Sequence, residues 1–136
     1  MQLTIENQTG FDLELKSSGS LIQSISSEQT VSIGLDNNGS YTLDYVETLL
    51  SSGLFSLIKS GVNAIKIQPL VRLEEYSPVN IEYTSGSFLG YAELQKVEDV
   101  FNFYGTNSYS DSEFITLPLC EENTEPDSVS IKISKY

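Results

Sequence analysis

Oxygen-bearing side chains in the C-terminal third of the chain are suited to hold a calcium ion. They lie in two short acidic segments, and the five candidate ligands are Asp111, Glu113, Glu121, Glu122 and Asp127. Ca²⁺ takes six to eight oxygen ligands, and carboxylates on neighbouring loops can supply several of them. Because the spacing of an EF-hand loop is absent, the alternative interpretation is a pair of solvated acidic loops that keep the protein soluble.

A second chemical feature is a polar segment that carries two tyrosines. Segment 104–110 begins with Tyr104, contains Tyr109, and directly follows Phe103. A tyrosine joins a flat apolar ring to a hydroxyl group, which suits contact with a sugar, a lipid headgroup or another protein. The two tyrosines of this expected loop, with Phe103 nearby on the expected strand 100–104, are the predicted ligand-binding residues. The alternative is that they pack on the edge of the fold.

The composition excludes several classes of catalytic and metal site. The chain has no His and one Cys, Cys120, so it forms no Ser-His-Asp triad, no His-ligated zinc site and no intrachain disulfide. Pairs of carboxylates are available, but the sequence does not show which of the 19 acidic residues face each other. We therefore expect a non-enzymatic protein without a cofactor, calcium being the one candidate ion.

Charge restricts the partners and the compartment. Seven Lys and Arg stand against 19 Asp and Glu, a formal net charge of −12. Nucleic acids and anionic membranes are recognised through Lys and Arg, so the expected partners are a neutral lipid or glycan surface or another protein, with oligomerisation left open. No stretch is long and apolar enough for a membrane span, and none resembles a signal peptide. We expect a cytoplasmic product that reaches the outside only by a non-classical route.

Alternating apolar and polar residues dominate the chain and predict strands. Ser and Thr together make up 30 of the 136 residues, typical of strands with one polar face. The predicted fold is all-β: one antiparallel β-sandwich domain of about ten short strands spanning residues 1–136. Residues 2–6 and 11–16 form its expected first hairpin. Ala64–Gln68 and Ser128–Ser134 are the expected sheet edges.

Two segments carry signals of another kind. Apolar residues in 48–60 recur at roughly helical spacing between a Thr and a Gly, which predicts one short helix there. The segment Asp36–Gly39 contains the pair Asn38-Gly39, which favours the two positive φ angles of a type I′ turn.

The opening segment Leu3–Leu15 resembles the first hairpin of the aegerolysin family: an alternating strand, then Asn7-Gln8-Thr9-Gly10, then a second alternating strand. Actinoporin-like cytolysins carry a similar segment, and their last strand resembles Val129–Lys135. The resemblance covers about 20 residues at the two ends. It implies a β-sandwich that binds lipid or glycolipid and acts with a partner protein in pore formation.

These observations lead to a predicted function and two alternatives. The leading prediction is a non-enzymatic, cytolysin-like binding protein that uses Tyr104, Tyr109 and Phe103 against a neutral lipid or glycan, alone or with a partner protein. One alternative is a structural subunit of a particle or inclusion, which pairs its strands edge to edge. The other is an acidic inhibitor that occupies a basic protein surface by virtue of the −12 charge.

Overall fold

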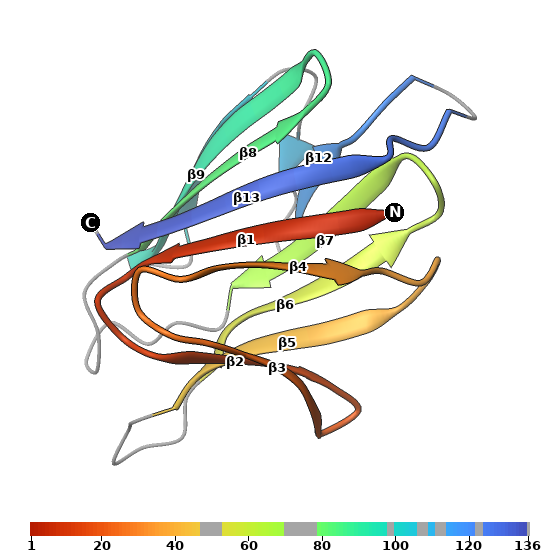
Figure 1. Cartoon of the computed structure of the whole chain (residues 1–136). Helices are drawn as coiled ribbons and strands as arrows, with labels where there is room; N and C mark the ends of the chain where they lie inside the picture. The colour runs from red at the N-terminus through yellow and green to blue at the C-terminus, as the bar shows by residue number, and fades with distance from the viewer. Residues whose placement is uncertain are drawn as a thin grey trace.

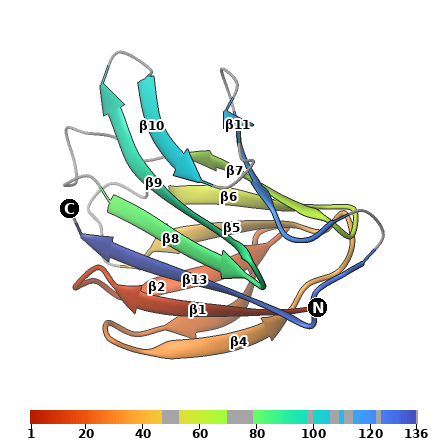
Figure 2. The ribbon, with the colours of Figure 1, turned by 90° about the horizontal axis from the view of Figure 1, so that it is seen from above.

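The computed structural model describes residues 1–46, 53–69, 79–97, 100–105, 109–110, 114–121 and 124–135, and these residues form two stacked β-sheets (Figures 1 and 2). The six-stranded sheet has the order β10 (Val100–Gly105), β9 (Phe88–Val97), β8 (Val79–Ser85), β13 (Ser128–Lys135), β1 (Gln2–Gln8) and β4 (Thr30–Gly34). The seven-stranded sheet has the order β11 (Tyr109–Ser110), β12 (Ile115–Pro118), β7 (Ala64–Pro69), β6 (Gly53–Ser60), β5 (Ser40–Tyr45), β2 (Leu13–Ser17) and β3 (Ser20–Ile25). None of the described residues forms a helix that could span a membrane.

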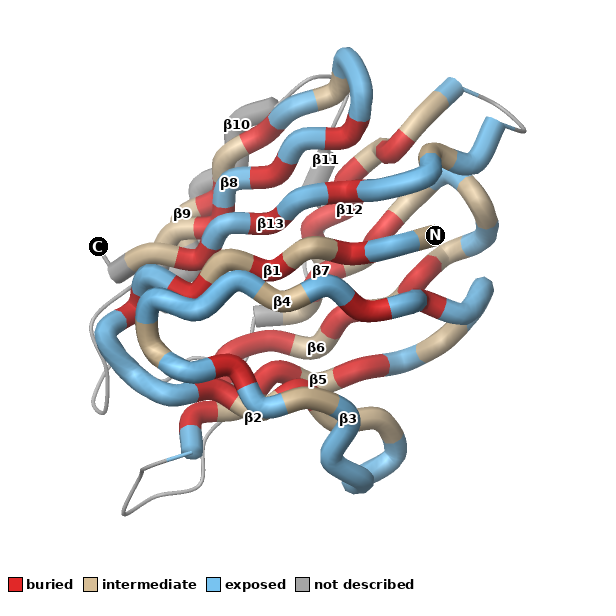
Figure 3. Tube along the Cα trace, in the orientation of Figure 1, coloured by how far each residue is buried: buried red, intermediate tan, exposed pale blue. Residues whose placement is uncertain are grey.

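The all-β fold is confirmed, and the described residues form thirteen strands. Its core lies between the sheets, and alternate residues of strands such as β1, β2 and β5 face inward (Figure 3). In β1 these are Leu3 and Ile5, and in the neighbouring β13 they are Val129, Ile131 and Ile133, all at most 2% exposed. The strands β1 and β13 run parallel, whereas the other pairs are antiparallel.

Asn7 occupies the third core-facing position of β1, where the alternation calls for an apolar residue, and it is 0% exposed. Its Nδ2 group donates to three backbone carbonyl oxygens, those of Phe11 at 2.8 Å, Ile25 at 3.0 Å and Ser26 at 3.2 Å. Its Oδ1 atom accepts from the backbone N–H of Thr9 at 3.0 Å and from the Thr9 hydroxyl at 2.7 Å. The amide therefore satisfies the backbone where the chain leaves one sheet and enters the other.

The predicted first hairpin is wrong. β1 pairs with β13 and β4, whereas β2 pairs with β3 and β5 in the opposite sheet. The segment between β1 and β2 crosses from one sheet to the other because the buried Asn7 and Thr9 turn it into the interior rather than back along β1. A local alternating pattern specifies the strands but not their partners.

The helix predicted for 48–60 is also wrong. Residues 53–60 form strand β6, and residues 48–52 lie outside the described part of the chain. Leu43 pairs with Phe55 and Asp44 with Gly53, so Leu54 is an extra residue in the ladder, a β-bulge. The bulge buries the consecutive residues Leu54 and Phe55, and this imitates helical spacing in the sequence.

The turn at Asp36–Gly39 is present, but it is not of type I′. Asn38 has a φ of 62°, whereas Gly39 is not among the residues with positive φ. The backbone N–H of Gly39 donates to the carbonyl of Asp36 at 3.0 Å, and the turn carries the chain from β4 to β5 in the other sheet. Gly39 is required for space, since a Cβ there would lie 2.6 Å from the Tyr41 hydroxyl.

The predicted sheet edges prove to be interior strands. The segment 64–68 lies in β7, between β12 and β6, and the segment 128–134 lies in β13, between β8 and β1. The observed edges are β4 and β10 in one sheet and β3 and β11 in the other. β13 is central because β1 enters the sheet beside it in parallel, a long-range pairing with no local signal.

Two side chains of β8 hold the sheets together at the end of β12. The Tyr83 hydroxyl donates to the carbonyl of Pro118 at 3.1 Å, and the Ser85 hydroxyl donates to the carbonyl of Leu119. Tyr83 is 2% exposed, and burial raises the pKa of its phenol from 10.0 to about 12. Both hydroxyls thus bridge from the six-stranded sheet to the chain that leaves the seven-stranded sheet.

Replacing Asn7 with Ala should lower the free energy of unfolding by about 3 kcal/mol, because several buried backbone groups lose their partner at once. Urea denaturation measures this change. The matched control is Gln8→Ala at the neighbouring exposed position, for which we expect a change within about 0.5 kcal/mol. Equal effects of the two substitutions would contradict the role given to the Asn7 amide.

Replacing Tyr83 with Phe should change how the free energy of unfolding depends on pH above pH 10. The native phenol keeps its proton until about pH 12, whereas the unfolded phenol ionises near pH 10.0. The wild-type contribution is therefore complete below pH 10 and declines as the pH rises toward 12. Tyr83→Phe should lose about 1 kcal/mol at neutral pH and should decline less steeply above pH 10. Parallel curves for the two proteins would contradict this assignment.

Candidate functional site

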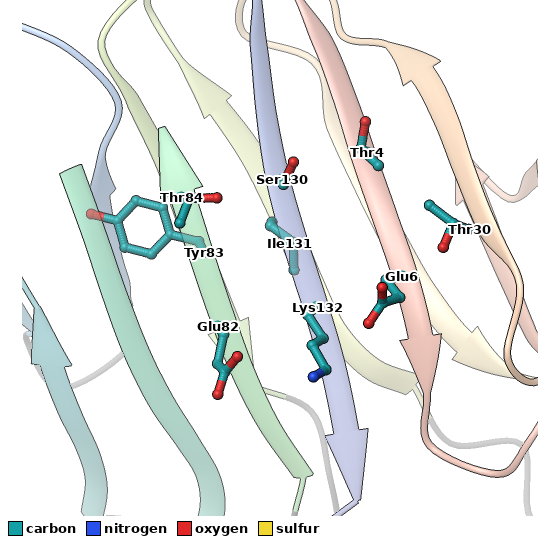
Figure 4. A pocket seen from close by; sticks show the side chains of 9 residues that line it. All are labelled: Thr4, Glu6, Thr30, Glu82, Tyr83, Thr84, Ser130, Ile131 and Lys132. Atoms are coloured by element: carbon teal, nitrogen blue, oxygen red, sulfur yellow. The ribbon is translucent and has the colours of Figure 1, made fainter. Parts of the chain in front are cut away.

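The outer face of the six-stranded sheet carries a hollow of about 200 Å³. It lies over four strands, β8, β13, β1 and β4 (Figure 4). Its lining consists of polar side chains that alternate with the core residues: Thr4, Glu6, Thr30, Glu82, Thr84, Ser130 and Lys132. Tyr83 and Ile131 also border the hollow, and both are buried, so the hydrophobic core and the Tyr83–Pro118 hydrogen bond support its base.

A charged row crosses the hollow. Lys132 on β13 pairs in register with Glu6 on β1 on one side and with Glu82 on β8 on the other. Figure 4 shows the three side chains at the same level of the sheet, the lysine between the two glutamates. Neighbouring strands lie about 4.8 Å apart, so one small ligand can reach all three side chains.

A row of hydroxyl groups lies next to the charged row. Ser32, Thr4, Ser130 and Thr84 occupy matching register positions on β4, β1, β13 and β8. The hydroxyls of Thr4 and Ser32 are hydrogen-bonded at 2.9 Å. Each hydroxyl can both donate and accept a hydrogen bond, so the row adapts to either kind of ligand group.

Among the described residues, the charged side chains of the hollow form no ion pairs. None of the ion pairs among the described residues includes Lys132, Glu6 or Glu82. The seven-stranded sheet differs in this respect: there Lys16 lies 3.5 Å from a Glu14 oxygen and 3.4 Å from an Asp44 oxygen. The hollow therefore keeps one ammonium group and two carboxylates available to a ligand.

The two tyrosines predicted for ligand binding are not on one loop, whereas Phe103 lies on a strand as expected. Phe103 and Tyr104 lie in β10, paired with Ala92 and Tyr91 of β9. Tyr109 lies in β11, paired with Thr116 of the other sheet. The expected loop 104–110 is thus wrong at both ends, because strand pairing extends into it and only residues 106–108 between the strands lie outside the description. Their role in binding stays a prediction.

The predicted calcium ligands are only partly described. Asp111, Glu113 and Glu122 lie outside the described residues, while Glu121 and Asp127 are exposed. The described portion contains no group of three or more His, Cys, Asp or Glu residues arranged to hold a metal ion. Cys120 is half-buried, and its Sγ atom lies 3.7 Å from the carbonyl oxygen of Val62. A calcium site in these acidic segments remains a prediction.

The residues of the hollow were not singled out by the sequence. Alternation places Thr4 and Glu6 on the outer face, but neither has a motif around it. Their meeting with Lys132 depends on the parallel pairing of the first and last strands, which are more than 120 residues apart in the chain. In the sequence, the residues of the hollow are marked only by being polar and alternating with apolar core residues. Every strand with one solvated face has this pattern, so it does not identify a binding site.

Comparisons with protein-family models, with curated proteins and with solved structures found no match for this chain.

Proposed function

We propose that this protein is a non-enzymatic binding protein that recognises a neutral, hydroxyl-rich ligand, a glycan, on the outer face of its six-stranded sheet. One observation carries the proposal: Lys132 lies between Glu6 and Glu82 beside a row of hydroxyls, and none of the three forms an ion pair within the described part of the chain. Carboxylates accept hydrogen bonds from sugar hydroxyls, and an ammonium group donates to them.

The surface favours a glycan over a lipid. The lining side chains of the hollow are polar apart from Tyr83 and Ile131, both of which are buried. A lipid surface calls for exposed apolar side chains. Where burial is described, Leu89, paired with Thr84, is the one large exposed apolar residue in register with the hydroxyl row. That leucine, 58% exposed, offers an apolar contact to one C–H face of a sugar ring.

The electrostatics favour an uncharged ligand. Two carboxylates and one ammonium give the hollow a formal charge of −1, within a chain of net charge −12. Anionic polysaccharides, nucleic acids and anionic lipid headgroups meet repulsion on such a surface. Neutral oligosaccharides do not, and they match the mixture of donors and acceptors in the two rows.

Replacing Lys132 with Met should weaken binding to a neutral glycan at least tenfold, equivalent to about 1.4 kcal/mol, without lowering the melting temperature, because the side chain is exposed. Affinity electrophoresis through gels containing single neutral polysaccharides identifies a bound glycan, and calorimetry with its oligosaccharide measures the dissociation constant. Lys16→Met on the other sheet is the matched control. Unchanged binding by Lys132→Met contradicts the site.

A double substitution of Tyr104 and Tyr109 to Ala separates this site from the one predicted from the aromatic residues. If the tyrosines carry binding, the double variant loses it while Lys132→Met retains it. If the hollow carries binding, the pattern is reversed. Repeating both measurements on neutral sphingolipid vesicles, with calcium and then with a chelator, tests the lipid and metal predictions in the same way.

Assembly through sheet edges is the second candidate function, and the edge strand β3 favours it. Leu21 and Ile22 of β3 are 53% and 45% exposed, and no charged residue occurs in Ser17–Ser27. Uncharged edges that expose apolar residues invite pairing with another chain. Sedimentation should then show a concentration-dependent oligomer that Leu21→Lys converts to a monomer. A monomer at all concentrations contradicts assembly.

A further inference from the structure

Lys59 lies inside the sandwich, at a position where the alternation of the strand predicts an apolar side chain. Phe55, Leu57 and Lys59 are the alternating core-facing residues of β6, and Lys59 is 0% exposed. The turn that joins β4 to β5 covers this end of the strand: the backbone N–H of Asn38 donates to the carbonyl of Lys59 at 2.7 Å, and that of Lys59 donates to the carbonyl of Gly39 at 3.0 Å. The turn and the lysine are thus held in register.

Three oxygen atoms surround the buried ammonium group. The Lys59 Nζ atom lies 3.3 Å from Asn37 Oδ1 and 3.4 Å from Glu125 Oε1, and it also donates to the carbonyl of Gly61. The amino group of Met1 lies 4.0 Å from the same Glu125 oxygen. A nucleophile, an amide and a carboxylate from three separate segments therefore meet at one point.

We propose that Lys59 and Asn37 join in an intramolecular amide cross-link, with Glu125 transferring the protons. The lone pair of Nζ forms a bond to Cγ of Asn37, and the bond from Cγ to Nδ2 breaks. Nζ begins as –NH₃⁺ and ends as an amide N–H. The two protons that it gives up pass through the Glu125 carboxylate to Nδ2, which departs as an ammonium ion. Nothing is oxidised or reduced, and Glu125 is restored.

The surroundings of the three groups favour this reaction over an ordinary hydrogen bond. Removal from water strips the competing solvent from the lysine nitrogen, while the adjacent carboxylate can take its proton. Asn37 is exposed, so the released ammonium ion has a direct path to solvent. Fixing the two reacting groups in one fold replaces a slow encounter with an intramolecular step of high effective concentration.

The cross-link would tie the two sheets together. Asn37 follows β4 of the six-stranded sheet, whereas Lys59 belongs to β6 of the seven-stranded sheet, 22 residues further along the chain. It would close a covalent loop around β5 in a protein whose single cysteine cannot form an intrachain disulfide. The inference concerns the scaffold and does not depend on ligand binding in the hollow.

Intact mass measurement of the freshly purified, denatured protein tests the proposal. The wild type should be lighter than its sequence mass by one ammonia, about 17 Da. Asn37→Ser and Glu125→Gln should each restore the full mass expected for their sequences. Asn38→Gly is the matched control in the same turn, because glycine tolerates the φ of 62°, and it should keep the loss.

Tryptic digestion locates the bond. No Lys or Arg lies between Lys16 and Lys59, or between Lys59 and Lys66. The cross-linked chain should therefore yield one peptide covering residues 17–66, lighter by one ammonia and uncut at Lys59, whereas Asn37→Ser should be cut there. A wild-type protein of full mass overturns the proposal, and so does a loss that persists in Asn37→Ser.

Discussion

The buried amide of Asn7 is the interaction on which the arrangement of the sheets depends. It lies at a core-facing position of the first strand, and its hydrogen bonds reach the backbone of the following crossover and of the end of β3. An apolar residue there would leave these backbone groups unpaired in the interior. Because the crossover is satisfied internally, β1 is not folded back into a hairpin and remains free to pair on both sides, with β13 and with β4.

That placement of β1 produces the candidate binding face. A parallel β1–β13 pair aligns Glu6 with Lys132, and the antiparallel β13–β8 pair aligns Lys132 with Glu82. If β1 had paired with β2, as local alternation suggests, Glu6 would lie in the seven-stranded sheet. Lys16 already pairs with Glu14 and Asp44 in that sheet. The available charges of the hollow thus follow from the topology rather than from any local motif.

The sequence predicted what depends on neighbours along the chain and missed what depends on distant strands. Alternation around Leu3 and Ile5 correctly indicated an all-β sandwich, because one face of each strand must be buried. Strand β6 was not recognised because the bulge at Leu54 and the buried Lys59 both break its two-residue period of apolar residues. The bulge depends on pairing with β5, and Lys59 depends on oxygen atoms of distant turns. The pairing of Glu6 with Lys132 likewise requires knowledge of strand order, which composition and spacing do not contain.

Polar groups inside this sandwich have hydrogen-bond partners within the protein, whereas the charged groups of the hollow on its outer face form no ion pairs among the described residues. Asn7, Tyr83 and Lys59 are buried, and each has acceptors or donors within the protein, as burial of a polar group demands. Lys132 and its flanking carboxylates face solvent, where no such demand exists, so an unpaired state costs little and leaves them available. A change at an interior polar residue should therefore act first on stability, whereas a change in the hollow should act on binding alone. If a change at an interior polar residue altered binding without altering stability, or a change in the hollow altered stability, the assignment of these residues to scaffold and binding site would be wrong.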